Sequence, residues 1–198
     1  MLQLPAIAST LLNYPYIDQN LPEWNTIASI GFLIAHEIGH AFDAQLYFFN
    51  QSAQAISMSE EMKNEFEQRI DCIIKKYDKF RFPDGSFSDG TFTKEEDSAD
   101  MIGFNLAYRL FKKLEKNQQK IPGLEDFTVE QTYFQRLAYT WCAPDLDQES
   151  IEFQKIDSHS ANKFRVNGMM SNSVEFARAF GCKMGSPMNP EKKCTLFK

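Results

Sequence analysis

The sequence predicts a mainly α-helical domain with little β-structure. Apolar residues recur every three or four positions in several separate segments, which is the period of an amphipathic helix, and no segment shows a strong strand pattern. One of these segments contains the sequence H-E-x-x-H and another contains E-x-x-x-D. With 198 residues, 43% of them hydrophobic and 18 of them Phe, the chain is long and apolar enough for one domain, residues 1–198, with a real core.

The first predicted helix spans Thr26 to Phe49 and has Asn25 as its N-cap. It contains no proline, and its apolar residues follow the helical period: Ile27, Ile30, Leu33, Ile34, Ile38, Ala41 and Phe42. The preceding 24 residues hold three prolines and predict an irregular, extended lead-in.

Apolar periodicity and end signals predict four more helices. They are a helix opened by the capping box Ser57-x-x-Glu60 and running to Tyr77, a helix from Thr93 to Lys116, a helix capped by Thr128-x-x-Gln131 and ending near Trp141-Cys142, and a short helix from Ser173 to Phe180 that Gly181 stops. Two turn signals lie between residues 80 and 92, residues 143–170 give a mixed pattern, and the last residues predict a loop.

The H-E-x-x-H sequence is formed by His36, Glu37 and His40. Because positions four apart lie on one face of a helix, His36 and His40 can direct both imidazoles at one metal ion. Glu37 lies about 100° further round the helix, so it can hold a water on that metal without being a ligand. This is the zincin arrangement, in which two histidines bind zinc and a carboxylate is the general base. The alternative is a pair of buried structural histidines.

A tetrahedral catalytic zinc needs a third protein ligand and keeps its fourth position for water. The extended motif that adds a third histidine on the same segment fails, because Asp43 and Leu46 occupy its glycine and histidine positions. The best remaining candidate is Glu96, with Asp100 one helical turn later to hydrogen-bond the outer nitrogen of a histidine. Thr93-x-x-Glu96 is also a capping box, which is an equally good use of the glutamate.

Composition argues against several other classes of protein. The net charge is −6, the pI is about 5.2 and Lys and Arg do not cluster, so we expect no nucleic-acid partner. No apolar run reaches the ~18 residues of a membrane span, and the N-terminus lacks the basic region of a signal peptide. Four cysteines without a C-x-x-C pair fit disulfides in an oxidising compartment, as does the glycosylation sequon Asn50-Gln51-Ser52.

A series of short motifs follows in order along nearly the whole chain. It comprises Leu2-Gln3-Leu4-Pro5, the histidine helix from Ile30 to Asp43, the E-x-x-A-D element from Glu96 to Asp100, Asp157-Ser158-His159-Ser160 with Phe164-Arg165, the segments Asn172 to Phe176 and Ala179 to Cys182, and the closing run from Met188 to Cys194. In this order the set resembles the C-terminal catalytic part of the neprilysin-type zinc metallopeptidases, the family of neprilysin and the endothelin-converting enzymes.

The resemblance implies one zinc ion per chain, bound by His36, His40 and Glu96. It implies that Glu37 activates the water and passes its proton to the leaving amine, and that Asp100 orients a zinc histidine. His159 would donate a hydrogen bond to the oxyanion, and Arg165 would pair with a substrate carbonyl or order the site.

The resemblance also implies a pocket for the residue after the scissile bond, lined by Phe32, Leu33 and Trp141, and hence a hydrophobic preference there. All three residues are equally well explained as core. The chain departs from the family pattern at Asp97, where Asn is usual, and in a shorter segment after Asp43.

The family's N-terminal domain is absent from this sequence, so the resemblance implies a fragment or the product of a truncated gene. By the same resemblance, Cys72 pairs with Cys194, whereas Cys142 and Cys182 match positions whose partners lie in the missing region. We expect these two to be unpaired or mispaired here. The implied location is extracellular, or the ectodomain of a cell-surface protein.

The predicted function is therefore that of a zinc metalloendopeptidase. It would cleave oligopeptides on the N-terminal side of hydrophobic residues. One alternative is a truncated or catalytically silent family member that binds zinc without hydrolysing peptides, and another is a helical interaction domain with no metal.

Overall fold

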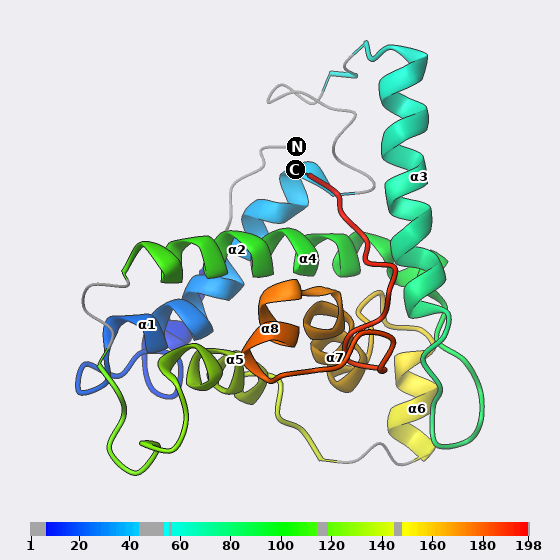
Figure 1. The fold of residues 1–198 in the computed structure, drawn as a ribbon. Coiled ribbons are helices and arrows are strands. Elements are labelled where there is room, and N and C mark those ends of the chain that lie inside the picture. Colours follow the sequence, from blue (N-terminus) through cyan, green and yellow to red (C-terminus); the bar gives the residue numbers. More distant parts are fainter. Residues whose placement is uncertain (1–6, 44–53, 56, 115–118, 145–147, 198) are drawn as a thin grey trace.

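Two helices, α2 and α4, cross at the centre of the molecule and the remaining helices pack around them (Figure 1). The computed structural model describes residues 7–43, 54, 55, 57–114, 119–144 and 148–197, without the side chains of 148–150. The helices are η1 (Ser9–Leu12), α1 (Glu23–Thr26), η2 (Ile27–Gly31), α2 (Phe32–Gly39), η3 (His40–Phe42), α3 (Glu60–Tyr77), α4 (Gly90–Lys113), α5 (Val129–Tyr139), α6 (Gln148–Gln154), α7 (Asn162–Asn172) and α8 (Val174–Ala179).

The predicted mainly α-helical class is confirmed. Within the described residues, extended pairing is limited to isolated bridges, such as those between Arg81 and Phe87 and between Ser186 and Asn189. None of the helices described in the structure has both the length and the hydrophobicity to cross a membrane.

The helix with the histidines is one continuous run of four elements, from the start of α1 to the end of η3, with a π-helical segment, η2, in the middle. Its predicted N-cap at Asn25 is wrong, because the cap is Pro22 and Asn25 lies inside α1 with 1% of its surface exposed. Proline fixes its own φ and needs no hydrogen-bond partner for a backbone N–H, so the helix can begin directly after it. The last predicted helical residues, 44–49, and the sequon at 50–52 lie outside the described residues.

Two other predicted caps are also wrong. Helix α3 is capped by Ser59, whose hydroxyl accepts from the Met62 N–H, rather than by Ser57. Helix α4 is capped by Asp89, whose carboxylate accepts from the Phe92 N–H, so Thr93 is already inside the helix. In both cases another oxygen-bearing side chain close by satisfies the first free N–H groups.

The capping box at Thr128 and Gln131 is confirmed at the start of α5, and Gly181 adopts a φ of 64° after α8 as expected of a helix stop. Helix α7 was missed in the mixed segment. Its buried face includes Arg165, Gly168 and Ser171 beside its apolar residues, and these obscure the apolar period.

The main core lies between the histidine helix, α4, α5 and α7. Its buried residues are Trp24, Ile27, Ala28, Phe32, Phe104, Ala107, Tyr108, Phe111, Tyr133, Phe134, Leu137, Met169 and Met170. A second cluster packs α3 against α4 and the C-terminal segment. The two clusters cover α4 on separate faces, which fixes its position relative to α2.

The C-terminal segment is attached to α3 by the disulfide between Cys72 and Cys194, as the resemblance implied. Asn172 adds a second attachment, since its side chain donates to the Cys194 carbonyl and accepts from the Cys194 N–H, both at 2.7 Å. Cys142 and Cys182 are free cysteines.

Replacing Cys72 and Cys194 together by Ala should lower the free energy of unfolding by about 2–5 kcal/mol, because the disulfide closes a long loop in the unfolded chain. The separation is 122 residues. Denaturant unfolding measures the change, and Cys142→Ala is the matched control because Cys142 is exposed and free. Equal losses in both variants would contradict the loop-closure argument.

Candidate metal centre

The site is assembled where the backbones of α2 and α4 touch. A Cβ atom added at Gly103 would lie 2.7 Å from the His36 nitrogen, and one added at Gly39 would lie 2.9 Å from the Ala99 oxygen. Real Cβ atoms essentially never approach backbone this closely, so both positions require glycine for the observed packing. The contact places the turn that holds His36 and His40 directly over the turn that holds Glu96 and Asp100.

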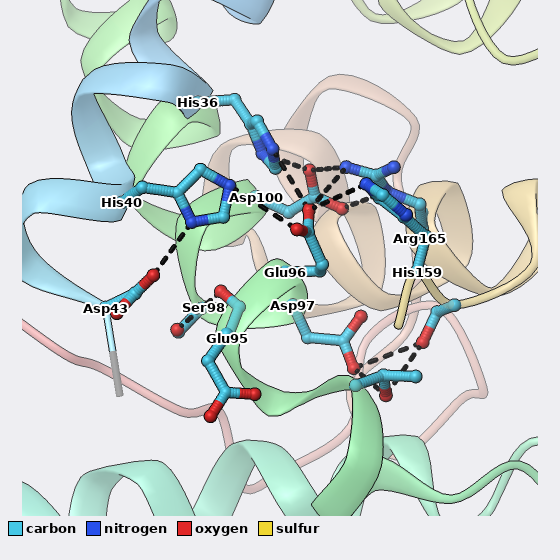
Figure 2. A network of polar contacts seen from close by, with 12 residues as sticks. His36, His40, Asp43, Glu95, Glu96, Asp97, Ser98, Asp100, His159 and Arg165 are labelled. Carbon is cyan, nitrogen blue, oxygen red and sulfur yellow. Dashed lines mark hydrogen bonds and ion pairs between the residues drawn. The ribbon is translucent and has the colours of Figure 1, made fainter. Parts of the chain in front are cut away.

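Figure 2 shows three imidazoles that meet at the carboxylate of Glu96. The Nε2 atoms of His36 and His159 each lie 3.2 Å from Glu96 Oε2, and Nε2 of His40 lies 3.6 Å from Oε1. The structure therefore brings together the three proposed zinc ligands and the proposed oxyanion donor. Among the described residues, His36, His40 and Glu96 are the group of potential ligands whose donor atoms all lie within 4.8 Å of one another.

Each of these imidazoles has an aspartate at its other nitrogen. The Nδ1 atoms of His36 and His40 lie 2.9 Å from Asp100 and 2.8 Å from Asp43, respectively. Nδ1 of His159 lies 2.9 Å from Asp157, which also accepts the backbone N–H of His159. A carboxylate at Nδ1 favours the proton there, so Nε2 of His36 and of His40 can present its lone pair towards Glu96.

This arrangement needs a positive charge at its centre, because the lone pairs on Nε2 and the Glu96 oxygens otherwise repel one another. Oε2 of Glu96 is buried and has no hydrogen-bond partner within the described part of the chain. Two ligands bound tetrahedrally at about 2.05 Å would lie roughly 3.4 Å apart. The separations of 3.2 and 3.6 Å between the histidine nitrogens and Glu96 therefore fit zinc.

The pKa values agree with a site built for a cation. Hydrogen bonds to Asp43 and then to Glu96 raise the pKa of His40 to about 10. Burial alone would raise the pKa of Glu96, but His36 and His40 hold it well below its ordinary value. Without a metal, protons on the imidazoles balance the glutamate, and a metal ion would replace them.

Asp100 connects this centre to Arg165. The aspartate is fully buried and accepts two hydrogen bonds of 2.7 Å from the guanidinium, in addition to its contact with His36. Burial works to raise the pKa of Asp100, but Arg165 and then His36 hold it below its ordinary value. Arg165 also lies over the ring of Trp141, with its Cζ 4.0 Å from the ring centroid.

The remaining predicted site residues lie around this centre. Glu37 is exposed on α2, next to the ligand His36, and the side chain of His159 is 46% exposed, so both can be reached by water and substrate. Phe32 is fully buried in the core against Trp141, and Leu33 packs against the same cluster. Whether these three residues line a substrate pocket stays a prediction.

Asp97, the residue at which the sequence departs from the resemblance, points away from the ligand cluster. Its Oδ2 accepts from the hydroxyls of Thr93 and Ser160, at 2.7 and 3.1 Å, and its Oδ1 has no hydrogen-bond partner among the described residues. Burial raises the pKa of Asp97 well above its ordinary value, with a contribution from nearby Asp100. Its environment therefore favours the uncharged acid, which resembles the usual amide in shape and charge.

Comparison with known proteins agrees with this geometry. The family model for peptidase family M13 matches residues 3–196. The chain belongs to peptidase family M13. Neprilysin-11 of Caenorhabditis elegans is 30% identical over 192 residues, and human neprilysin is 31% identical over 193 residues. Each match covers 94% of this chain but only 23% and 26% of the relative, respectively, so the chain spans about a quarter of their length.

Solved structures place the same fold in M13 relatives. Zinc metalloprotease ZMP1 of Mycobacterium tuberculosis, in complex with an inhibitor, superposes with a TM-score of 0.83 and 26% identity, over 94% of this chain and 30% of ZMP1. A Haemonchus galactose-containing glycoprotein complex gives a TM-score of 0.86 and 27% identity, over 94% of this chain and 32% of that chain.

Sequence reasoning missed four residues of this M13 centre. In the sequence, Asp43 was noted only as the residue at the glycine position of the longer histidine motif. Asp43 lies three residues after His40, so its side chain can reach the His40 ring from the next turn. Asp157 was recognised as part of a motif but given no partner. Gly39 and Gly103 gave no signal of their own, because the requirement for glycine arises only where the two helices touch.

Gly103→Ala should lower the affinity for zinc at least about tenfold, the lower end of the effect expected when the support of metal ligands is disturbed. The added methyl group would collide with the backbone of His36 and move α2 away from Glu96. Isothermal titration with zinc measures the affinity. Gly31→Ala is the control, because a Cβ there meets only ordinary contacts of 3.4 Å or more. Equal affinity in both variants would contradict the proposed close contact.

Asp97→Asn should make the metal-free protein more stable at pH 7, because the amide, unlike the acid, has no proton to lose as the pH rises. The folded-state pKa is raised, so the folded protein keeps a proton that the unfolded chain loses above about pH 4. The wild type therefore loses stability as the pH rises from about 4 towards the folded-state pKa, and the amide removes this loss. Denaturant unfolding from pH 4 to 8 measures it; parallel curves for the two proteins would contradict the assignment.

Proposed function

We propose that this chain is the catalytic part of a zinc metalloendopeptidase that hydrolyses oligopeptides. The observation that carries the proposal is the meeting of His36, His40 and Glu96 at distances that suit one tetrahedral zinc. Bound zinc would supply a Lewis acid that polarises the peptide carbonyl and lowers the pKa of a water. Family membership and the zinc metalloprotease among the similar structures support the same reaction.

Three side chains of this chain would then handle protons and charge. Glu37, exposed beside His36, takes a proton from the attacking water and delivers it to the leaving amine. In its doubly protonated form His159 donates from Nε2–H to the oxyanion, while its Nδ1–H donates to Asp157. Arg165 keeps Asp100, and through it His36, in a fixed orientation.

We also propose a preference for a hydrophobic residue after the scissile bond, supported by the aromatic contact between Phe32 and Trp141 close to His36. An oxidising, extracellular location is proposed from the disulfide between Cys72 and Cys194. The rival proposal is a silent family member, which would bind zinc but hydrolyse no peptide.

Zinc analysis and hydrolysis of a quenched hydrophobic peptide, measured together, test the function. Wild-type protein should contain one zinc per chain and cleave the peptide. Glu96→Ala should lose both, because the site would keep only two ligands. Zinc without hydrolysis in the wild type would favour the silent alternative, and a folded wild-type chain that binds no zinc would overturn the enzyme proposal.

Glu37→Gln is the matched variant that separates chemistry from metal binding. Because Glu37 is not among the ligand atoms around Glu96, zinc content should stay at one per chain. Hydrolysis should fall by about 10²–10⁴-fold, the usual contribution of a general base. Wild-type activity in Glu37→Gln would remove this residue from the mechanism.

A further inference from the structure

A cavity of about 210 Å³ opens beside His159, between the turn at Arg81–Phe87, the first turn of α4 and the end of α6. Its walls include Phe82, Phe87 and Phe92, and the His159 ring forms part of its lining. The same imidazole lies 3.2 Å from Glu96. His159 therefore borders both the cavity and the candidate metal centre, and the cavity shares none of its lining residues with the predicted pocket of Phe32, Leu33 and Trp141.

The charged side chains along this cavity already have partners. Lys155 Nζ lies 2.8 Å from Glu152 and 3.4 Å from Asp84, and the carboxylate of Asp89 caps α4. The hydroxyl of Ser160 and that of Thr93, which also belong to the lining, are buried and bonded to Asp97. These groups thus offer little to a charged ligand. Gln154, which also lines the cavity, has a buried Oε1 with no hydrogen-bond partner among the described residues and leaves one acceptor for a hydrogen-bond donor of the ligand.

Two of the three aromatic walls, in contrast, are left open to solvent, whereas Phe82 is buried. Phe87 is 62% exposed and Phe92 is 44% exposed. Among the ring contacts described for Phe87, one covers a face of the ring: the guanidinium of Arg81, whose Cζ lies 5.6 Å from the ring centroid. An apolar group placed between these rings would bury aromatic surface that is now exposed to water. The volume is below the ~300 Å³ at which pockets for drug-sized ligands begin, and it suits a single side chain.

We propose that this cavity is a second substrate subsite, which binds one large apolar side chain, aromatic or Leu-like, of a peptide held at His159. The inference rests on the proposed peptidase function, because His159 connects the cavity to the reaction. It adds a second position of apolar selectivity to the one proposed at Trp141. The two positions would lie on different elements and could be altered separately.

A binding experiment tests the subsite without requiring turnover. Zinc-loaded chain with ¹³C-labelled Phe, His and Trp is titrated with N-acetylphenylalanine amide and, in parallel, with N-acetylglycine amide. The phenylalanine probe should shift the ring signals of Phe87, Phe92 and His159 in a saturable way, and the glycine probe should not. Phe87→Ala should weaken this binding at least about tenfold, the lower end of the effect of filling an apolar pocket.

Phe153→Ala is the matched control, since Phe153 is 60% exposed on neighbouring α6 but does not line the cavity. It should bind the phenylalanine probe as the wild type does. Shifts confined to Trp141 and its neighbours, or equal binding by Phe87→Ala and wild type, would overturn the subsite.

Hydrolysis gives a second measurement where the chain turns over peptide. In a series of peptides with one Phe moved along a Gly-rich background, wild type should favour Phe at two positions. Phe87→Ala should lower the preference, measured as a ratio of kcat/KM values, at least about tenfold at one position only. A preference unchanged by Phe87→Ala would overturn the subsite. Zinc-loaded wild type that hydrolyses none of the peptides would count against the peptidase proposal alone, and the binding experiment would still decide on the subsite.

Discussion

The metal centre depends on one steric condition, the direct contact of two helix backbones at Gly39 and Gly103. Helices in proteins usually pack with axes about 8–10 Å apart, a spacing set by the side chains between them. Here a glycine on each helix removes the side chain at the crossing, and backbone atoms of one helix occupy the space of a missing Cβ on the other. Short imidazole and carboxylate side chains can therefore span the gap. The two hydrophobic clusters and the disulfide to α3 hold α4 in this position.

Three acidic side chains, those of Glu96, Asp97 and Asp100, lie on little more than one turn of α4 at this contact. The negative charge of each is balanced or avoided in a different way. Asp100 is paired with Arg165, and Asp97, whose pKa is raised by burial, accepts hydrogen bonds from two hydroxyls. Glu96 faces the Nε2 atoms of His36 and His40. The Nδ1 atoms of the same two rings contact Asp100 and Asp43. A buried charge that lacks a fixed partner is costly, so the local electrostatics reserve Glu96 for a cation. Glu96, Asp97 and Asp100 thus have three different chemical environments, and the fourth acid of this run, Glu95, lies 3.3 Å from Lys94.

The sequence predicted the parts of this arrangement that depend on local spacing. The helical period, the four-residue spacing of the histidines and the capping box at Thr128 are set by neighbours along one helix, and all are seen in the structure. The caps at Asn25, Ser57 and Thr93 were predicted wrongly because several residues nearby could satisfy the same free N–H groups, and packing decided between them. Glu96 could be either cap or ligand from spacing alone, and the resemblance favoured the ligand. The pairing of Asp43 with His40 and the need for glycine at position 103 depend on the tertiary contact, which no local pattern encodes.

The two candidate substrate pockets differ in how they are connected to the metal centre. Trp141 stacks on Arg165, and Arg165 donates hydrogen bonds to Asp100. Asp100 in turn contacts the ring of His36. A change at Trp141 can therefore reach a proposed metal ligand through three direct contacts. For the cavity at Phe87, the described contact with a proposed ligand is that of His159, which lies 3.2 Å from Glu96, and neither Phe87 nor Phe92 takes part in it. Its open walls come from a turn and from the first turn of α4, and it meets the centre only at His159, whose own support comes from Asp157. Selectivity at the pocket proposed around Trp141 would therefore be tied to the geometry of the proposed zinc ligands, whereas the walls at Phe87 could be altered while those residues stay in place. If selectivity diverges within this architecture, the Phe87 cavity is where it can do so at the least cost to the metal site.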